Sequence, residues 1–424
     1  MVRGFFVSTN QNVPFIMKKN LNCIFFVLIF ISSACIAQQN NSAVEVKTGA
    51  QVLIENNLPD LLGKKIGLVI NHTARIGYVH VLDTLIASGV NITSIFAPEH
   101  GYRGDIADGE LIKNGVDKLT GLPVFSLYDS NKRPTKEMMD SVDILLFDMQ
   151  DVGARFYTYN STMKYILEAG AEFEKEVWIL DRPNPAGGEY VAGWVLEDEY
   201  KSFIGSYPIP ISHGLTLGEL ALMAIGENWL NTEKQPIVKV INLEGWQRSM
   251  KWSETGLTWI SPSPNLPTFE HAYVYLGTCF FEGVNISEGR GTEDPFLTIG
   301  APKTRFLPEE LKTLEEKYFI QLDTISFMPR SIPGKSNSPK FEDEKIYGVT
   351  LSPTSDFTRP VEFGLDLLKL FENKMISMDV DYQYRDHFFL LSGTRRVLNW
   401  TGEANWGSNF EEYLVNRKKY LLYD

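Results

Sequence analysis

The stretch VDILLFDMQD, residues 142–151, places four consecutive apolar side chains directly before Asp148 and Asp151. An apolar run without alternation indicates a strand buried on both faces, as in a parallel sheet covered by helices. Four further runs have the same character: KKIGLVINH (64–72), NITSIFAPEH (91–100), LPVFSLYD (122–129) and EVWILDRPNP (176–185). Segments with helical spacing lie between them, so the sequence predicts the βαβ repeat of a doubly wound, Rossmann-like sheet.

The chain divides into three regions by composition and pattern. Residues 1–37 read as a signal region that is removed on export, with two lysines, an apolar run and a small-residue exit at Ala37. The apolar run over 23–31 is too short to give a stable membrane span. We expect a Rossmann-like N-terminal domain over 45–255 and a smaller α+β C-terminal domain over 256–424.

Charge and cysteine content narrow the function classes. The chain has 40 Lys and Arg against 53 Asp and Glu, a net charge of −13. Bulk electrostatics therefore do not favour nucleic acid or an anionic membrane as a partner. Cys23 and Cys35 lie in the signal region, which leaves Cys279 as a small core residue and allows no internal disulfide. We expect an exported, periplasmic protein, and a lipid anchor on Cys35 is the alternative.

Motifs for nucleotide binding and for a serine nucleophile bear on the chemistry of this chain. No G-x-G-x-x-G follows the run at 64–72 and no P-loop is present, so we expect no nucleotide and no other cofactor. Ser161 and Lys164 form an S-x-x-K motif, which leaves a serine acyl hydrolase as a further alternative. A helix N-cap at Asn160 or Ser161 also explains these residues. The oligomeric state does not follow from the sequence.

Every predicted strand of the sheet ends in polar residues. The carboxyl ends of parallel strands lie along one edge, and ligands bind in the crevice beyond that edge. The polar residues at these ends are Asn71, His72, Glu99, His100, Asp129, Asp148, Asp151, Asp181, Arg182 and Asn184. Their coincidence over five strands predicts a binding site there.

The second half of the chain contributes three more groups. His213 precedes a helix whose Thr216 and Glu219 are spaced as a capping box, so His213 is either a site residue or structural. Asn265 lies in the proline-rich SPSPNLP. The glycine-rich loop over 277–296 suits close folding around a ligand or a solvated surface, and its charged residues are Glu282, Glu288, Arg290, Glu293 and Asp294. The segment SIPGKSNSPKFEDEK (331–345) is predicted to be an exposed loop.

Five motifs in register carry a resemblance to a known family. In chain order they are FAPEHGYRG, FDMQDVGARFYTY, LDRPNPAGG, SPNLPT and SEGRGTEDPF. Together they resemble the exo-β-N-acetylmuramidase family of the NamZ type, also catalogued as domain of unknown function 1343. The resemblance covers about residues 50–424. It implies a Rossmann-like domain joined to a smaller C-terminal domain with the active cleft between them. It also implies release of terminal N-acetylmuramic acid from the non-reducing end of peptidoglycan fragments.

Glycoside hydrolysis requires an acid for the leaving oxygen and a nucleophile or base on the other side of the sugar. We assign Glu99 as the acid, since it follows an apolar strand, and His100 as the group that orients it. Glu288 is the favoured second carboxylate, because it belongs to the opposite domain. Glu293, Asp148 and Asp151 also qualify for that role. If the substrate's N-acetyl group is the nucleophile, the second carboxylate only orients it.

The expected substrate carries a lactyl carboxylate, for which an arginine is the natural bidentate partner. Four arginines are candidates: Arg103, Arg155, Arg182 and Arg290. Tyr157 and Tyr159 either stack on a sugar face or belong to the core. Further candidates for substrate contact are Asn71, Asp148, Asp151, Asp181, Asn184, His213, Asn265 and Glu293.

Two alternative readings stay open from the sequence. The first is a divalent cation held by Asp148, Asp151 and Asp181, although strand-end charges more often bind backbone groups and sugar hydroxyls. The second is a periplasmic muropeptide-binding protein that binds sugar fragments in the same cleft without catalysis.

Overall fold

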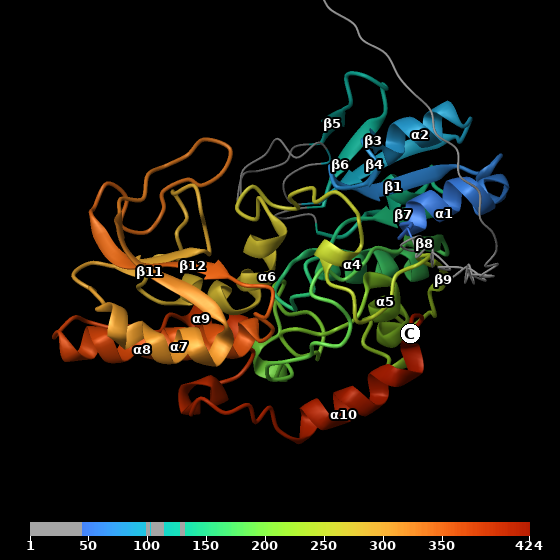
Figure 1. Ribbon diagram of the computed structural model, residues 1–424. Coiled ribbons are helices and arrows are strands. Elements are labelled where there is room, and N and C mark those ends of the chain that lie inside the picture. The colour runs from blue at the N-terminus through green and yellow to red at the C-terminus, as the bar shows by residue number, and fades with distance from the viewer. Residues whose placement is uncertain (1–44, 99–101, 103–113, 128–131) are drawn as a thin grey trace, which may run out of the picture. The chain divides into compact units, whose positions relative to one another are not determined.

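The computed structural model describes residues 45–98, 102, 114–127 and 132–424. A seven-stranded sheet dominates the N-terminal half (Figure 1). Its strands, in spatial order, are β5 (Gly115–Val116), β6 (Pro123–Ser126), β4 (Ile92–Ala97), β1 (Ile66–Ile70), β7 (Ile144–Asp148), β8 (Glu176–Leu180) and β9 (Ile237–Ile241). All neighbours pair in parallel except β5 and β6. The predicted Rossmann-like parallel sheet is thereby confirmed.

The strand order locates the place where a ligand is expected. The parallel strands run outward from β1 through β4 and β6 on one side, and through β7, β8 and β9 on the other. The winding direction therefore reverses between β1 and β7. In open α/β sheets the crevice beyond the carboxyl ends at such a reversal is the usual binding place.

Burial of both sheet faces explains the continuous apolar runs. Along β7, Ile144 and Leu146 belong to the core on one face, while Leu145 and Phe147 belong to the core on the other. Helices α1 (Gly49–Val52) and α2 (Val81–Ala87) contribute to the first core. Helices α4 (Tyr159–Glu172) and α5 (Leu217–Gly226) contribute to the second. A short α3 (Lys136–Met139) precedes β7.

The second half of the chain forms the smaller α+β region that the sequence predicts. Its antiparallel sheet has the order β10 (Thr298–Ala301), β12 (Ile346–Pro353), β11 (Ile320–Phe327). Its helices are α6 (Phe269–Thr278), α7 (Pro308–Tyr318), α8 (Pro360–Ser377), α9 (Asp386–Ser392) and α10 (Ser408–Arg417). The boundary at 255/256 stays a prediction. A two-residue hairpin, β2 (Arg75–Ile76) with β3 (Val79–His80), follows β1.

The end of the chain returns to the sheet domain. The Tyr413 hydroxyl on α10 donates to the His213 carbonyl over 2.6 Å. Beyond α10, the Tyr423 hydroxyl donates to Asp181 over 2.6 Å, and the backbone N–H of Leu422 donates to Glu219 over 2.9 Å. Residues 413–423 therefore pack against the domain that contains the seven-stranded sheet.

Helix starts test two of the local predictions. The capping box of Thr216 and Glu219 is present at α5 and is confirmed. The prediction of Asn160 or Ser161 as the N-cap of α4 is wrong, because that helix begins at Tyr159. The Asn160 amide instead donates to three carbonyls of the preceding turn, which ties the turn to the helix.

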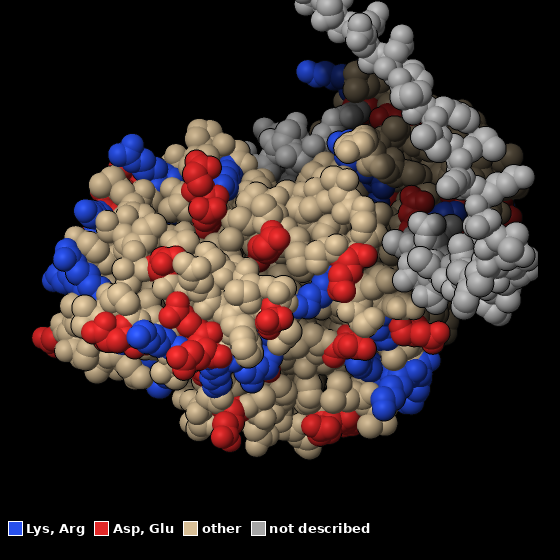
Figure 2. Space-filling view, in the orientation of Figure 1, with Lys and Arg blue, Asp and Glu red and all other residues tan. Residues whose placement is uncertain are grey.

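The visible surface carries acids and bases side by side rather than in one large patch of a single sign (Figure 2). Among the described residues, no helix combines the length and the apolar character needed to cross a membrane.

A close helix crossing gives a test of the C-terminal packing. Gly277 on α6 and Gly364 on α8 face each other, and a methyl group at Gly277 would overlap the Pro360 carbonyl. We expect Gly277→Ala to lower the free energy of unfolding by about 1–3 kcal/mol or more, because backbone cannot move aside as a side chain can. Urea unfolding measures this. Gly115→Ala is the control, since no atom of the described residues lies within contact distance of its added methyl. Equal stability of the two variants would contradict the account.

Candidate functional site

The carboxyl ends of β1 and β7 bring Asn71 and Asp148 to the reversal point of the sheet. Asn71 is buried, and its Oδ1 accepts hydrogen bonds from the backbone N–H of Thr73 at 3.0 Å and from the Thr73 hydroxyl at 2.5 Å. Its Nδ2 has no hydrogen-bond partner among the described residues. Because a buried amide group without a partner is costly, this donor is available to a ligand.

Asp148 and Arg182 satisfy each other. The guanidinium of Arg182 donates to both carboxylate oxygens of Asp148, at 2.5 and 3.1 Å, and also to the Arg75 carbonyl at 3.2 Å. Both side chains are buried. A bidentate pair of this kind holds the strand ends together. We therefore leave both residues out of the proposed substrate contacts and of the catalytic pair.

Asp181 and Asn184 serve the local fold. Asp181 accepts from the Gly218 N–H at 2.9 Å, the Thr216 hydroxyl at 2.7 Å and the Tyr423 hydroxyl. Burial raises its pKa to about 6, against the lowering effect of these hydrogen bonds. Asn184 donates to the Leu215 carbonyl at 3.0 Å and accepts from the Ala186 N–H. Neither side chain has an oxygen left over for a substrate.

The three-aspartate cation site is not supported by these contacts. Asp148 is taken by Arg182 and Asp181 by the start of α5, so only Asp151 keeps an unpartnered oxygen. Within the described part of the chain, no group of three or more His, Cys, Asp or Glu side chains is placed to hold a metal ion.

Asp151 and His213 form the second polar pair at this edge. The Asp151 Oδ2 accepts from the Gly153 N–H at 2.8 Å and lies 3.6 Å from the His213 Nε2. The His213 Nδ1 accepts from the Leu215 N–H at 3.2 Å, which assigns the ring proton to Nε2. Oδ1 of Asp151 and Nε2 of His213 are buried and have no hydrogen-bond partner among the described residues.

Gln150 belongs to the same edge, although the sequence did not single it out. Its Nε2 donates to the carbonyls of Asp151 at 2.8 Å and Pro183 at 2.9 Å, and its buried Oε1 has no partner in the described structure. Its position between two strand-end aspartates was the available signal. Among the described residues, this edge of the sheet therefore has two buried donors without a partner, on Asn71 and His213. It also has two buried acceptors without a partner, on Gln150 and Asp151.

Arg155 is a structural residue. It is fully buried, and its guanidinium donates to the carbonyls of Trp194, Ile209 and Leu391 at 2.7, 3.0 and 2.7 Å. Burial lowers its pKa to about 9. Because these carbonyls use its donors, Arg155 is left out of the proposed substrate contacts.

The loop after α6 holds a cluster of charges that includes Glu288. Glu288 is 3% exposed, and its Oε2 lies 2.9 Å from the Lys340 Nζ. Arg290 donates to Glu282 at 2.8 and 3.2 Å and lies 3.8 Å from Glu288. Burial opposes the charge of Glu282, but Arg290 and then His387 outweigh it and lower the pKa of Glu282 to about 2. Glu282 is thus ionised at any working pH.

Tyr157 and Arg290 line one small cavity of about 120 Å³, together with Glu282, His387 and Tyr275. The Tyr157 ring packs edge-on against Tyr159 and Tyr275, and burial raises the pKa of its phenol. Since ligand sites are usually about 300–1,000 Å³, this cavity suits one substituent of a ligand rather than a whole sugar.

The proline-rich loop over 261–267 connects the two groups of polar residues. His72 Nε2 donates to the Ser261 carbonyl at 2.6 Å, and Tyr159 donates to the Pro262 carbonyl at 2.7 Å. Asn265 in turn donates to the Lys335 carbonyl at 2.8 Å. The loop therefore connects the end of β1 with the segment around Lys335, which contacts the charged loop. Tyr159 is buried, and its hydroxyl is used by this loop, so it belongs to the core.

Other predicted residues fall elsewhere. Glu293 is exposed, and only its backbone carbonyl has a contact, with Lys335 Nζ at 3.2 Å. Ser161 is fully buried and donates to Ser206 at 2.9 Å. Lys164 donates to the Ser206 carbonyl rather than to Ser161. The serine acyl hydrolase is therefore not favoured.

Four of the residues predicted at strand ends and in the following loop lie outside the described residues: Glu99, His100, Arg103 and Asp129. Their assignments stay predictions.

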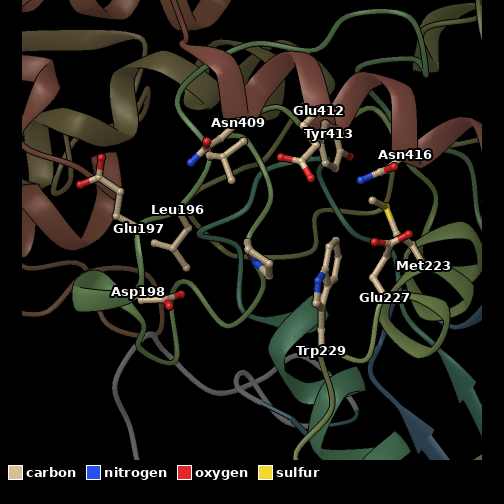
Figure 3. Close-up of a pocket in the computed structure, with 12 residues that line it drawn as sticks. Leu196, Glu197, Asp198, Met223, Glu227, Trp229, Asn409, Glu412, Tyr413 and Asn416 are labelled. Atoms are coloured by element: carbon tan, nitrogen blue, oxygen red, sulfur yellow. The ribbon is translucent and has the colours of Figure 1, made fainter.

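A larger hollow of about 460 Å³ lies between α5, α10 and the segment 195–198 (Figure 3). Its acidic lining residues are Glu197, Asp198, Glu227 and Glu412, around Trp229. Glu197 and Glu227 are already paired, with Arg396 and Lys419 respectively. None of the predicted site residues lines this hollow.

Comparisons with known proteins agree over almost the whole chain. Residues 66–270 match the family model "Exo-beta-N-acetylmuramidase NamZ, N-terminal", and residues 273–423 match its C-terminal counterpart. The curated "Peptidoglycan beta-N-acetylmuramidase NamZ" of Bacillus subtilis (strain 168) is 38% identical over 420 residues, covering 94% of this chain and 97% of that protein.

Two solved structures share the fold. Both are crystal structures of DUF1343 family proteins from Bacteroides fragilis NCTC 9343, and the match covers 90% of this chain in each case. One has a TM-score of 0.75 at 31% identity over all of its chain. The other has a TM-score of 0.74 at 35% identity over 99% of its chain.

The raised pKa of Asp181 makes stability depend on pH. Its pKa is about 6 in the folded protein against 3.8 ordinarily, so the folded state holds the proton more tightly. The resulting stabilisation is complete below about pH 3.8 and is lost as the pH rises through about 6. Asp181→Asn lacks this titration. We expect wild type to lose roughly 3 kcal/mol relative to the variant between pH 4 and 7, measured by urea unfolding. Parallel stability curves would rule the effect out.

Proposed function

The chain belongs to the NamZ exo-β-N-acetylmuramidase family, and we propose that it releases terminal N-acetylmuramic acid from the non-reducing end of peptidoglycan fragments. The carrying observation is the 38% identity to a peptidoglycan β-N-acetylmuramidase over 94% of the chain. The carboxylate of Glu288 is buried and lies 3.8 Å from Arg290, a residue that lines the aromatic cavity, and it supplies a group suited to that chemistry.

Hydrolysis breaks the bond between the anomeric carbon and the leaving oxygen. The acid gives its proton to the leaving oxygen, water gives hydroxide to the anomeric carbon, and a base takes the remaining proton. We assign the acid to Glu99 and the anionic carboxylate to Glu288. Asp151 stays the alternative for the second role, because its Oδ1 is buried without a partner among the described residues. Asp148 and Glu293 are less suited to that role, the first because Arg182 holds both of its oxygens and the second because its side chain is exposed.

The lactyl carboxylate of muramic acid is assigned to Arg290. Of the candidate arginines, Arg155 donates to backbone carbonyls and Arg182 to Asp148, while Arg103 lies outside the described residues and stays a prediction. Arg290 lines the small cavity and is oriented there by Glu282 and by the ring of Phe296, 5.3 Å from its guanidinium carbon. The size of the cavity matches one substituent, as a lactyl group requires.

The polar edge of the sheet supplies hydrogen bonds for the sugar. Donors on Asn71 and His213 and acceptors on Gln150 and Asp151 are buried and unpartnered in the described structure. Hydroxyl and acetamido groups offer both donors and acceptors, which are the kinds of group that these four atoms lack. This set is the part of the site that is specific to a carbohydrate rather than to a charged ligand.

A non-catalytic binding protein is not favoured, since the matched relative is named for a hydrolytic activity. The two readings are separated by a chromogenic N-acetylmuramide and the corresponding N-acetylglucosaminide. We expect chromophore release from the first and not from the second. Binding of the muramide without release would support the binding protein.

Replacing the proposed catalytic carboxylates tests their roles. Glu288→Gln and Glu99→Gln should each lower kcat by roughly 10²–10⁴-fold on the chromogenic muramide, because each removes a proton acceptor or donor. Glu293→Gln, on the same loop as Glu288 but exposed, is the control and should keep wild-type kcat. Near-normal kcat in Glu288→Gln would contradict its assignment as the second carboxylate. Asp151 would then take that role, and Asp151→Asn would test it.

We propose export from the signal region at 17–37, which lies outside the described residues. Expression of the full chain in a Gram-negative host, followed by fractionation and N-terminal sequencing, should recover periplasmic protein beginning after Ala37. Membrane-bound protein that starts at Cys35 would support the lipid anchor instead.

A further inference from the structure

Lys340 is held at the centre of the charged loop by four oxygens. Its Nζ donates to the carbonyls of Phe281 at 2.6 Å, Glu282 at 3.1 Å and Ile286 at 3.0 Å. The fourth oxygen is Oε2 of Glu288, at 2.9 Å. The ammonium therefore fixes the backbone turn that precedes Glu288 and the carboxylate itself at the same time.

The surroundings of Glu288 make this ammonium its main compensating charge. Oε2 of Glu288 is buried and accepts no hydrogen bond of good geometry from the described residues. The other cation facing the carboxylate is Arg290, whose Nε is 3.8 Å from Oε1 and which is already paired with Glu282. A buried carboxylate with so few hydrogen bonds is stable only next to a positive charge.

Lys335 provides a natural comparison within the same segment. Its Nζ reaches the carbonyls of Thr292 at 3.3 Å and Glu293 at 3.2 Å on the same loop. No carboxylate lies within ion-pair distance of it among the described residues. Both lysines therefore anchor the loop, but only Lys340 adds charge next to Glu288.

We propose that Lys340 is a positioning residue that holds Glu288 as an oriented carboxylate in the resting enzyme, ready for its step in the reaction. The proposal rests on the assignment of Glu288 in the proposed function. It gives Glu288 the anionic role, as base, nucleophile or orienting group, and requires another residue to donate the proton to the leaving oxygen. The segment 331–345, which reads as an exposed loop in the sequence, thereby becomes part of the site's supporting structure.

The test compares Lys340→Met with Lys335→Met through the pH dependence of kcat/KM on the chromogenic muramide. Loss of the ammonium next to Glu288 removes a charge that favours its anionic form, so the acid limb for Lys340→Met should move to higher pH than that of wild type. Its kcat at neutral pH should fall at least about tenfold, with KM changed less than about threefold, because substrate contacts are untouched. Lys335→Met should keep the wild-type limb.

Each outcome decides between a positioning and a structural role. An unshifted acid limb in Lys340→Met, with a loss of activity equal to that of Lys335→Met, would overturn the proposal. If Lys340→Met does not fold, Lys340→Gln keeps a donor for the carbonyls without the charge, and the same shift is expected. An active Glu288→Gln would instead refute the assignment of Glu288, whatever the lysine variants show. If Glu288→Gln is inactive and the acid limb of Lys340→Met is the same as that of wild type, only the role of Lys340 is refuted.

Discussion

Burial of the central sheet on both faces constrains everything else in the molecule. Because the residues of β1 and the apolar runs of β7 (144–147) and β8 (177–180) are buried, polar chemistry begins where these runs end. The reversal of winding between β1 and β7 then brings the ends of those two strands together. The position of the candidate site thus follows from the burial of both faces of the sheet.

Polar groups at this edge separate into two kinds once their partners are known. Asp148 and Asp181 are buried, and both carboxylate oxygens of each accept hydrogen bonds, so they stabilise the scaffold on which the site is built. Arg155 serves the same scaffold through three backbone carbonyls, although its Nε has no partner among the described residues. Asn71 and Asp151 are as deeply buried, yet each keeps one atom without a partner in the described structure. A buried polar atom without a partner lowers the stability of the fold unless a ligand supplies the missing hydrogen bond. Such atoms are therefore often found at functional sites.

The sequence predicted the sheet, its strand ends and the charged loop, because these depend on local patterns of apolar and polar residues. It did not distinguish Arg155 from Arg290, since both follow short glycine-containing motifs and differ only in which carbonyls and carboxylates surround them. Lys340 was missed for a related reason. Its partners lie more than 50 residues earlier in the chain, and its own segment has the composition of an exposed loop. Partners distant in sequence leave no local signal.

The contacts of the last three residues bear on how the chain is synthesised. Tyr423 reaches Asp181 beneath α5, Leu422 reaches Glu219, and the Asp424 carbonyl accepts from the backbone N–H of Arg248 at 2.7 Å. While these residues are still inside the ribosome, the first turn of α5 lacks its covering. The sheet domain therefore cannot reach its final packing before these three residues have been synthesised. A fusion partner attached directly after Asp424 would crowd the same contacts.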